Sequence, residues 1–145
     1  MKFKLAALAL GAALLGGVAM AGDATDPIVI AQKNLMKTFG GSAKTLGGMA
    51  GGEMAYDQAA AEAAKAALIA GAAEIAAKWE VAGNDPESES KPEIWTSWDD
   101  FMAKGKALGD AAAALDVASL EGIKAGMGAI GGTCKDCHTT YRVMK

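Results

Sequence analysis

The sequence predicts an all-α protein in which four helices form an antiparallel bundle. Alanine is the commonest residue, and it favours helices more than any other residue does. Only three prolines interrupt the chain, at positions 27, 86 and 92. Apolar residues recur three and four positions apart over long stretches, which is the spacing of one face of an α-helix. The connections between these stretches are short, so consecutive helices should run in opposite directions.

Residues 1–21 have the pattern of a secretory signal peptide. Lys2 and Lys4 give a basic start, residues 5–18 form an apolar run, and residues 19–21 (Ala-Met-Ala) match a cleavage site between small side chains. We expect cleavage there and export to the periplasm. An uncleaved membrane anchor is the alternative, but the run is short for that role, and no later stretch reaches the roughly 20 apolar residues that a membrane span needs.

The mature chain, residues 22–145, should form one domain of about 124 residues with a sizeable core. Cleavage lowers the number of basic residues from 14 to 12 against 17 acidic ones, which gives a net charge of −5. This balance, without a basic patch, predicts no binding to nucleic acid. The acidic excess suits contact with basic surfaces of partner proteins, and it also serves solubility.

The first helix is predicted to begin at Asp26-Pro27. Asp accepts hydrogen bonds from the free N–H groups at a helix start, and proline fits the first helical position because it has no N–H to leave unpaired. The glycines within residues 47–52 should end this helix. The predicted apolar stripe is Ile28, Ala31, Leu35, Phe39, Ala43, Leu46 and Ala50, with Gln32 and Met36 along its edge.

A second helix should run from Gln58 to Trp79 or Glu80, with Asp57 as its N-cap. Its predicted buried face consists of Leu68, Ala72, Ile75 and Trp79. Residues 81–96 contain two prolines, a glycine and a cluster of serines and glutamates. We expect them to form a loop or short turn rather than a packed element.

Two further helices are predicted in the last third of the chain. Ser97 and Asp100 resemble a capping arrangement at the start of the third helix. Its apolar residues are Trp98, Phe101, Gly105, Leu108, Ala112 and Leu115. The last helix, from about Ser119, carries Leu120, Ile123, Met127, Ile130, Cys134, Cys137, Tyr141 and Met144. This alternation of three and four is typical of bundles with coiled-coil-like packing, and it puts both cysteines at core positions.

The last helix contains Cys134-Lys135-Asp136-Cys137-His138. C-x-x-C-H is the motif for covalent attachment of a c-type haem, in which each thiol adds across a vinyl group and the His nitrogen binds the iron. On a helix, positions 134, 137 and 138 share one face. We therefore predict one covalently attached haem c near the C-terminal helix, with Cys134 and Cys137 as thioether positions and His138 as an iron ligand.

Other roles fit this motif less well. A dithiol redox motif belongs in a βαβ context, and a structural zinc site needs about four ligands, whereas the chain has two Cys and one His. A disulfide between positions i and i+3 of a helix is sterically awkward and closes almost no loop. A helical interaction module without haem is the remaining alternative, and it would show no Soret absorption.

An exported four-helix chain with a C-terminal C-x-x-C-H resembles the class II c-type cytochromes, the family of cytochrome c prime and its low-spin relatives from proteobacterial periplasms. The similarity covers essentially the whole mature chain. The segments that carry it are residues 131–142, residues 92–95 with Phe101, residues 52–57 and residues 39–41. The position of the motif after three helices points to this class, because the motif alone occurs in many cytochromes.

The resemblance implies further residues around the haem. It makes His138 the proximal ligand and puts Arg142 beside the imidazole, where a cation would disfavour protonation. A solvated residue near a helix C-terminus is an equally good interpretation of Arg142. Trp95 and Phe101 are similar to haem-packing aromatics of relatives, although aromatics at helical spacing are more often ordinary core.

Four polar positions also follow from the resemblance. Ser88 and Glu89 correspond to a short stretch that touches the haem in some relatives. Cytochromes c prime generally carry an Arg four residues before a bulky distal side chain, and alignment on the glycines at 40–41 puts Gln32 and Met36 at these two positions. Gln32 could still bond a haem propionate, and Lys33 could supply charge nearby.

Met36 has three interpretations. As a sixth iron ligand, its thioether would raise the reduction potential and keep the iron low-spin. As an unbonded wall, it would leave a five-coordinate iron open to small gases such as nitric oxide or carbon monoxide. It could also simply pack, as flexible methionines do. The missing Arg favours ligation.

These residues predict a periplasmic electron carrier that meets redox partner proteins, with a gas-binding cytochrome as the alternative. An enzyme such as a peroxidase is not expected, because the distal side would need an acid or base and the chain's one His is assigned to the proximal side. Relatives often dimerise through their first two helices, and the Ala- and Gly-rich surfaces here permit a homodimer.

Overall fold

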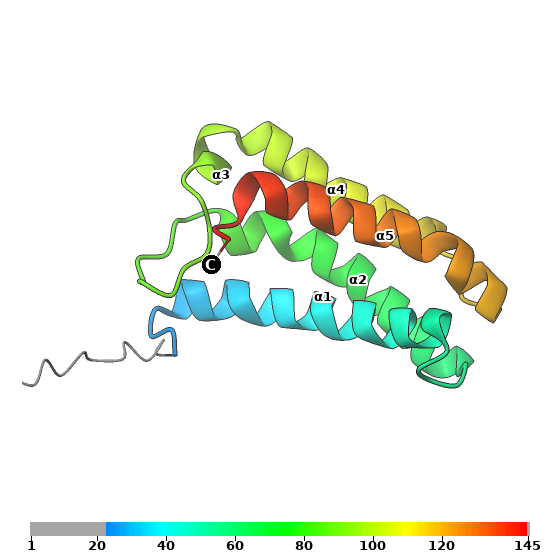
Figure 1. Cartoon of the computed structure of the whole chain (residues 1–145). Helices are drawn as coiled ribbons and strands as arrows, with labels where there is room; N and C mark the ends of the chain where they lie inside the picture. The colour runs from blue at the N-terminus through cyan, green and yellow to red at the C-terminus, as the bar shows by residue number, and fades with distance from the viewer. Residues whose placement is uncertain (1–22, 145) are drawn as a thin grey trace, which may run out of the picture.

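The structure, a computed structural model, describes residues 23–144. The predicted signal peptide lies outside the described residues. Five helices follow one another: α1 (Pro27–Gly51), α2 (Gln58–Trp79), α3 (Glu93–Thr96), α4 (Trp98–Ala114) and α5 (Leu120–Tyr141). The four long helices lie side by side, and α3 is a single turn at one end of the bundle (Figure 1). The predicted all-α bundle is confirmed.

The long helices form a closed ring. α1 packs against α2 and α5, and α4 packs against the same two helices. Because the connections between α1 and α2 and between α4 and α5 are short, each pair is antiparallel. Within residues 23–144, no helix is both long and apolar enough to cross a membrane.

The predicted ends of α1 are confirmed. Asp26 caps the helix, since its Oδ1 accepts from Ile28 N over 2.7 Å, and Pro27 occupies the first helical position. At the other end, Gly52 adopts a φ of 78°, which favours glycine, and donates to Met49 O over 3.1 Å.

The predicted stripe of α1 is confirmed at Leu35, Phe39 and Leu46, and the other predicted positions are replaced by neighbouring residues. The buried face consists of Val29, Gln32, Leu35, Phe39, Ser42, Leu46, Gly48 and Met49. Ile28, Ala31, Ala43 and Ala50 are only partly buried, and Gln32 lies within the stripe rather than at its edge. The reason is physical: alanines on both sides of the stripe give a weak apolar signal, so Val29 and Met49 decide its centre by their size.

α2 begins and ends as predicted, with Asp57 Oδ1 accepting from Ala60 N over 3.0 Å. Glycines bring its neighbours close. A Cβ on Gly71 would collide with the ring of Phe39 on α1, and a Cβ on Gly105 of α4 would lie 3.0 Å from Ile75 Cδ1. Small residues at these crossings therefore set the spacing of the helices.

Three predictions in the second half of the chain need correction. Residues 81–92 form the expected loop, but α3 does pack, because Ile94 is only 2% exposed. Ser97 precedes α4 without a side-chain capping bond, since its backbone is not in the extended conformation of the other caps. Met144 lies beyond the end of α5 and is 74% exposed.

α5 stops at Tyr141 because the chain then pairs with the loop. Lys91 N donates to Tyr141 O over 2.9 Å, Val143 N donates to Glu89 O over 2.8 Å, and Ser90 and Arg142 form an isolated antiparallel bridge. We call these two pieces, residues 89–91 and 141–143, the terminal clasp. It closes the bundle at the end where α1 begins (Figure 1).

Candidate haem site on the C-terminal helix

Cys134, Cys137 and His138 project from one face of α5. They stand at i, i+3 and i+4, and all three are half-buried. Both cysteines are free, and both pack against the apolar core. Two thiols and an imidazole that share one half-buried face could hold a flat haem through two thioether bonds and one iron ligand.

Burial governs the protonation of these groups. It raises the pKa of both thiols, that of Cys137 to about 11, and the cation of Lys104 opposes the shift at Cys137. Burial also lowers the pKa of His138, and Arg142 lowers it further, whereas Glu89 raises it. The imidazole is therefore held neutral, which is the form that binds a metal.

The register of α1 against α5 relates Met36 to His138. A Cβ at Gly47 of α1 would lie 3.9 Å from Met127 Cε of α5, so these two residues are neighbours across the contact and serve as the reference for counting along both helices. Both helices rise about 1.5 Å per residue and they run in opposite directions. Eleven residues back from Gly47 is Met36, and eleven residues on from Met127 is His138, so these two also share a level.

The surroundings of Met36 and Cys134 are only partly covered. The same register puts Gly40 of α1 near the level of Cys134, and Gly40 is exposed, with no atom within 4 Å of where its Cβ would stand. The Met36 side chain is half-buried against the core. Two free thiols and a half-buried imidazole on α5, with a half-buried thioether on α1, are therefore the chemical groups that could hold a haem here.

Gln32 and Lys33 are engaged with other groups. The Gln32 side chain is 3% exposed, its Nε2 donates to Lys78 O over 3.0 Å, and its Oε1 lies 3.5 Å from the Ser90 hydroxyl. Lys33 Nζ lies 3.8 Å from a carboxylate oxygen of Glu87. The amide of Gln32 thus joins α1 to the end of α2 and to the terminal clasp.

Ser88, Glu89 and Arg142 come together at the end of α5. Arg142 Nε donates to Glu89 Oε2 over 2.6 Å, and Ser88 Oγ accepts from Ser90 N over 3.3 Å. Both charges of this pair act on His138, with opposite signs. The structure therefore brings the predicted polar stretch beside the predicted proximal ligand.

Trp95 and Phe101 belong to the packing of the bundle end. Trp95 Nε1 donates to Trp79 O over 2.8 Å. The Phe101 ring is buried among three other aromatic rings, with centroid distances of 5.9 Å to Trp79, 5.6 Å to Trp98 and 5.3 Å to Tyr141. Phe101 thus reaches α5 through Tyr141, three residues after His138.

One group beside the site was not predicted from the sequence. Lys104 of α4 forms an ion pair of 2.6 Å with Asp136, the residue that precedes Cys137. The Tyr141 hydroxyl donates over 2.6 Å to Asp100, one turn before Lys104. Only the four-residue spacing of Asp100 and Lys104 was visible in the sequence, and it gave no sign that α5 supplies the other partners.

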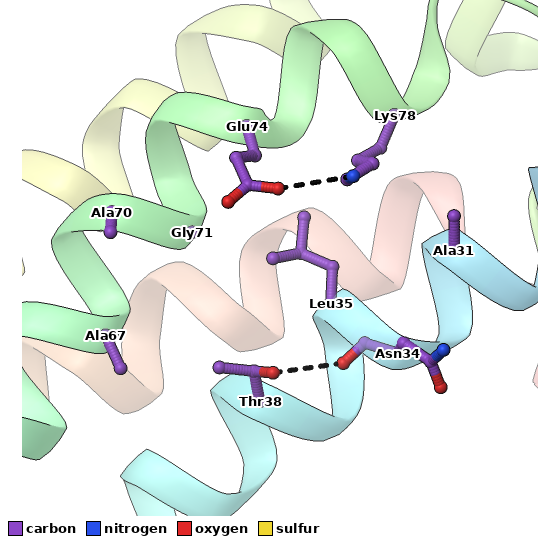
Figure 2. A pocket seen from close by; sticks show the side chains of 9 residues that line it. All are labelled: Ala31, Asn34, Leu35, Thr38, Ala67, Ala70, Gly71, Glu74 and Lys78. Carbon is purple, nitrogen blue, oxygen red and sulfur yellow. Dashed lines mark hydrogen bonds and ion pairs between the residues drawn. The ribbon is translucent and has the colours of Figure 1, made fainter.

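A groove of about 420 Å³ lies elsewhere, on the outer face of α1 and α2. Leu35 and Thr38 line it from α1, and Ala67 and Ala70 line it from α2 (Figure 2). None of the predicted haem residues lines this groove, so it is a separate feature.

Comparison with known proteins identifies the family. A family model described as Cytochrome C' matches residues 28–142. The chain is 37% identical over 140 residues to cytochrome c' of Cereibacter sphaeroides, which covers 92% of this chain and 93% of that protein. It is 34% identical over 143 residues to cytochrome c-556 of Agrobacterium fabrum, which covers 97% of this chain and 94% of that protein.

The fold gives the same result. The structure of cytochrome c' from Rhodobacter Spheriodes matches with a TM-score of 0.74 and 34% identity, over 81% of this chain and 96% of that one. Family model, relatives and fold agree over nearly all of the described residues. The chain belongs to the cytochrome c' family, whose members carry one covalently attached haem c.

Proposed function

We propose that this protein is a periplasmic one-electron carrier, with haem c attached through Cys134 and Cys137 and with His138 and Met36 as the axial ligands. The shared level of Met36 and His138 on facing helices is the observation that carries this proposal. Haem c, when bound, supplies a one-electron couple at its iron. A thioether ligand raises the reduction potential of such a couple.

The chain's own residues help to keep the site fixed. Burial and Arg142 hold the imidazole of His138 neutral, so that a ring nitrogen is free for the metal. The aromatic packing around Phe101 and the terminal clasp close the end of the bundle behind His138. A rigid site favours electron transfer, because little has to rearrange when the charge changes.

An optical spectrum of the haem-loaded protein tests the role of Met36. We expect a sharp low-spin spectrum with a weak far-red band from sulfur to iron. Met36→Ala should convert it to a broad high-spin spectrum that shifts readily with carbon monoxide. Met127→Ala is the matched control, because Met127 is half-buried on the same α1–α5 seam but eleven residues from His138. An unchanged spectrum in Met36→Ala would refute the ligation.

The second candidate is a five-coordinate cytochrome that binds nitric oxide or carbon monoxide. The observation that favours it is the packing of Met36 against the apolar core, which an unbonded distal wall would share. In that case the unmodified protein would already show the broad spectrum and the shift with carbon monoxide. The same measurement therefore separates the two functions.

We propose no enzymatic role. Peroxide chemistry needs an acid or base on the distal side of the haem, and the one His of the sequence is the proposed proximal ligand. Haem-loaded protein should show only background peroxidase activity, and sustained turnover would contradict the proposal.

Export predicts a mature N-terminus after Ala21, which sequencing of the periplasmic protein would test.

We also propose that the outer face of α1 and α2 joins two copies of the chain. Ile30 and Ile69 on these helices are 39% and 38% exposed, and the Ala-lined groove between the helices admits a neighbouring side chain (Figure 2). Ala70→Glu should shift the protein toward a monomer in sedimentation analysis, because it buries a charge. Ala125→Glu, on the exposed face of α5, should change nothing. A monomeric parent protein would rule out the dimer.

A further inference from the structure

Four side chains meet on the seam between α4 and α5. Lys104 Nζ lies 2.6 Å from Asp136 Oδ2 and 3.9 Å from Asp100 Oδ2. The Tyr141 hydroxyl donates over 2.6 Å to Asp100. We call Asp100, Lys104, Asp136 and Tyr141 the seam cluster. It ties α5 to α4 at two points, one on each side of His138 along the chain.

Asp136 connects the seam cluster to the turn of α5 that carries the two cysteines. It stands between Cys134 and Cys137, and successive residues of a helix are about 100° apart around the axis, so its side chain leaves from a different face than theirs. A bond from Asp136 to α4 therefore resists rotation of the turn that carries both thiols. The buried Tyr141 ring, 5.3 Å from the ring of Phe101, holds the following turn in the same way.

Lys104 is unusually shielded for a lysine in an ion pair. Its side chain is 18% exposed, whereas that of Lys106, which pairs with Asp110 on the same helix, is 73% exposed. Charges shielded from water and salt act more strongly over the same distance. The Lys104 cation lies beside the attachment turn, since its partner at 2.6 Å, Asp136, is the residue directly before Cys137.

We propose that Lys104 is a positioning residue of the haem site: through Asp136 it fixes the rotation of the attachment turn, and its charge raises the reduction potential of the haem held at Cys137. This proposal rests on the proposed attachment at Cys134 and Cys137, and it is independent of the role of Met36.

The charge of each side chain sets the direction in which it shifts the reduction potential, and its exposure sets how strongly water screens it. Reduction removes one positive charge from the iron, so a nearby cation favours the reduced form and a nearby anion favours the oxidised form. Asp136 opposes Lys104, but its side chain is 65% exposed and is therefore more strongly screened. Asp100, at 58%, is also more exposed than Lys104. The charges therefore act in opposite directions on the potential, and the least exposed of them is that of Lys104.

Redox titration of haem-loaded variants tests the proposal. Lys104→Met should lower the midpoint potential, Asp136→Asn should raise it, and Lys104→Arg should leave it near the parent value because the charge is kept. Both Lys104→Met and Asp136→Asn should also lower the fraction of chains that carry haem on the cysteine peptide, measured by mass spectrometry. A loss of packing alone would move both midpoints in one direction.

Lys106→Met is the matched control, since Lys106 forms an ion pair on the same helix with an exposed partner. It should leave both the midpoint and haem loading unchanged. Equal shifts in Lys104→Met and Lys106→Met, or shifts of the same sign in Lys104→Met and Asp136→Asn, would overturn the proposal. Absence of haem from the cysteine peptide of the parent protein would instead remove the proposed attachment itself.

Discussion

Gln32 joins three elements through one buried amide. Its Nε2 donates to Lys78 O, one of the last carbonyls of α2, which have no partner within their own helix. Its Oε1 faces the hydroxyl of Ser90, which also accepts from Trp79 Nε1 over 3.0 Å. Gln32→Leu would remove the donor to the Lys78 carbonyl and the acceptor of the Ser90 hydroxyl, in a partly buried site. We expect a loss of about 1–3 kcal/mol in the free energy of unfolding, measured with denaturant on haem-loaded protein.

Gln58 provides the control for this substitution. Its amide donates over 2.8 Å to Glu62 on the exposed face of α2. Gln58→Leu should change stability by no more than about 0.5 kcal/mol, because water replaces the lost bond. Similar losses in the two variants would show that the Gln32 amide carries no special role.

Asp85 fastens the loop to the start of α1 in a pH-dependent way. Its carboxylate accepts from the backbone N–H groups of Asp26, Glu87 and Thr25, and these bonds lower its pKa to about 2. A carboxyl whose pKa is lower in the folded state stabilises the fold above its ordinary pKa, and the effect is lost as pH falls toward the folded value. The window is therefore about pH 4 down to 2.

Thermal unfolding of haem-loaded protein at pH 7 and at pH 3 tests this. Asp85→Asn should lose stability at pH 7, and its melting temperature should fall less between the two pH values than that of the parent. Glu62→Gln, an exposed carboxylate on α2, should keep the parent's pH dependence. Parallel curves for Asp85→Asn and the parent protein would contradict the assignment.

At the scale of elements, the contact between α1 and α2 depends on Gly71. A Cβ there would collide with the Phe39 ring and lie 3.0 Å from Leu35 Cδ1. Gly71→Ala should destabilise the protein by about 1–3 kcal/mol despite the better helix propensity of alanine, because the Phe39 ring and the Leu35 side chain must shift. Gly128→Ala, where a Cβ meets nothing within 4 Å, should instead stabilise α5 by up to about 1 kcal/mol. Denaturant unfolding of both variants measures the contrast.

The sequence predicted the helix ends well, because local bonds determine them, and it predicted the buried faces of the helices less well. Asp26-Pro27, Asp57 and Gly52 mark their helix ends through bonds made within a few residues, so the sequence is sufficient to predict them. The buried face of α1 depends on what packs against it. In an Ala-rich helix several faces are nearly equally apolar, and for that reason Gln32 was predicted at the edge rather than within the core.

Ile94 and Met144 also show that local spacing does not reveal tertiary contacts. The hydrophobic character of Ile94 was plain, but a one-turn helix has no periodicity from which to infer that it packs. Met144 continued the spacing of α5, yet the chain leaves the helix at Tyr141 to pair with residues 89–91, and such a pairing cannot be read from local spacing.

At the scale of the whole molecule, the candidate site was predictable where it depends on one helix. Cys134, Cys137 and His138 share a face by helix geometry alone, whereas the position of Met36 relative to them depends on the register of α1 against α5, which the sequence does not give. The seam cluster was missed because its partners on α4 and α5 are 32 and 41 residues apart in the sequence. An ion pair between charged residues on different helices produces no periodic pattern in the sequence.

The terminal clasp connects the ends of the chain to the site, and its removal gives a prediction for the whole molecule. A protein that ends at Tyr141 loses the Val143-to-Glu89 bond, which is one of the two bonds of the Ser90–Arg142 bridge, and the Arg142–Glu89 ion pair. We expect amide exchange in residues 88–91 to rise about tenfold in haem-loaded protein, because the net worth of these two interactions is about 1.4 kcal/mol.

A protein that ends at Val143 is the matched control, because it keeps the clasp and should retain the parent's exchange rates. Exchange in α4 should stay slow in both truncated proteins, since its buried face of Phe101, Gly105 and Leu108 does not involve the clasp. The Arg142 cation would also be lost from beside His138 in the shorter protein, so the pKa of the imidazole should rise in haem-free protein. Unchanged exchange in residues 88–91 would mean that the loop is held by Asp85 and Trp79 without help from the C-terminus.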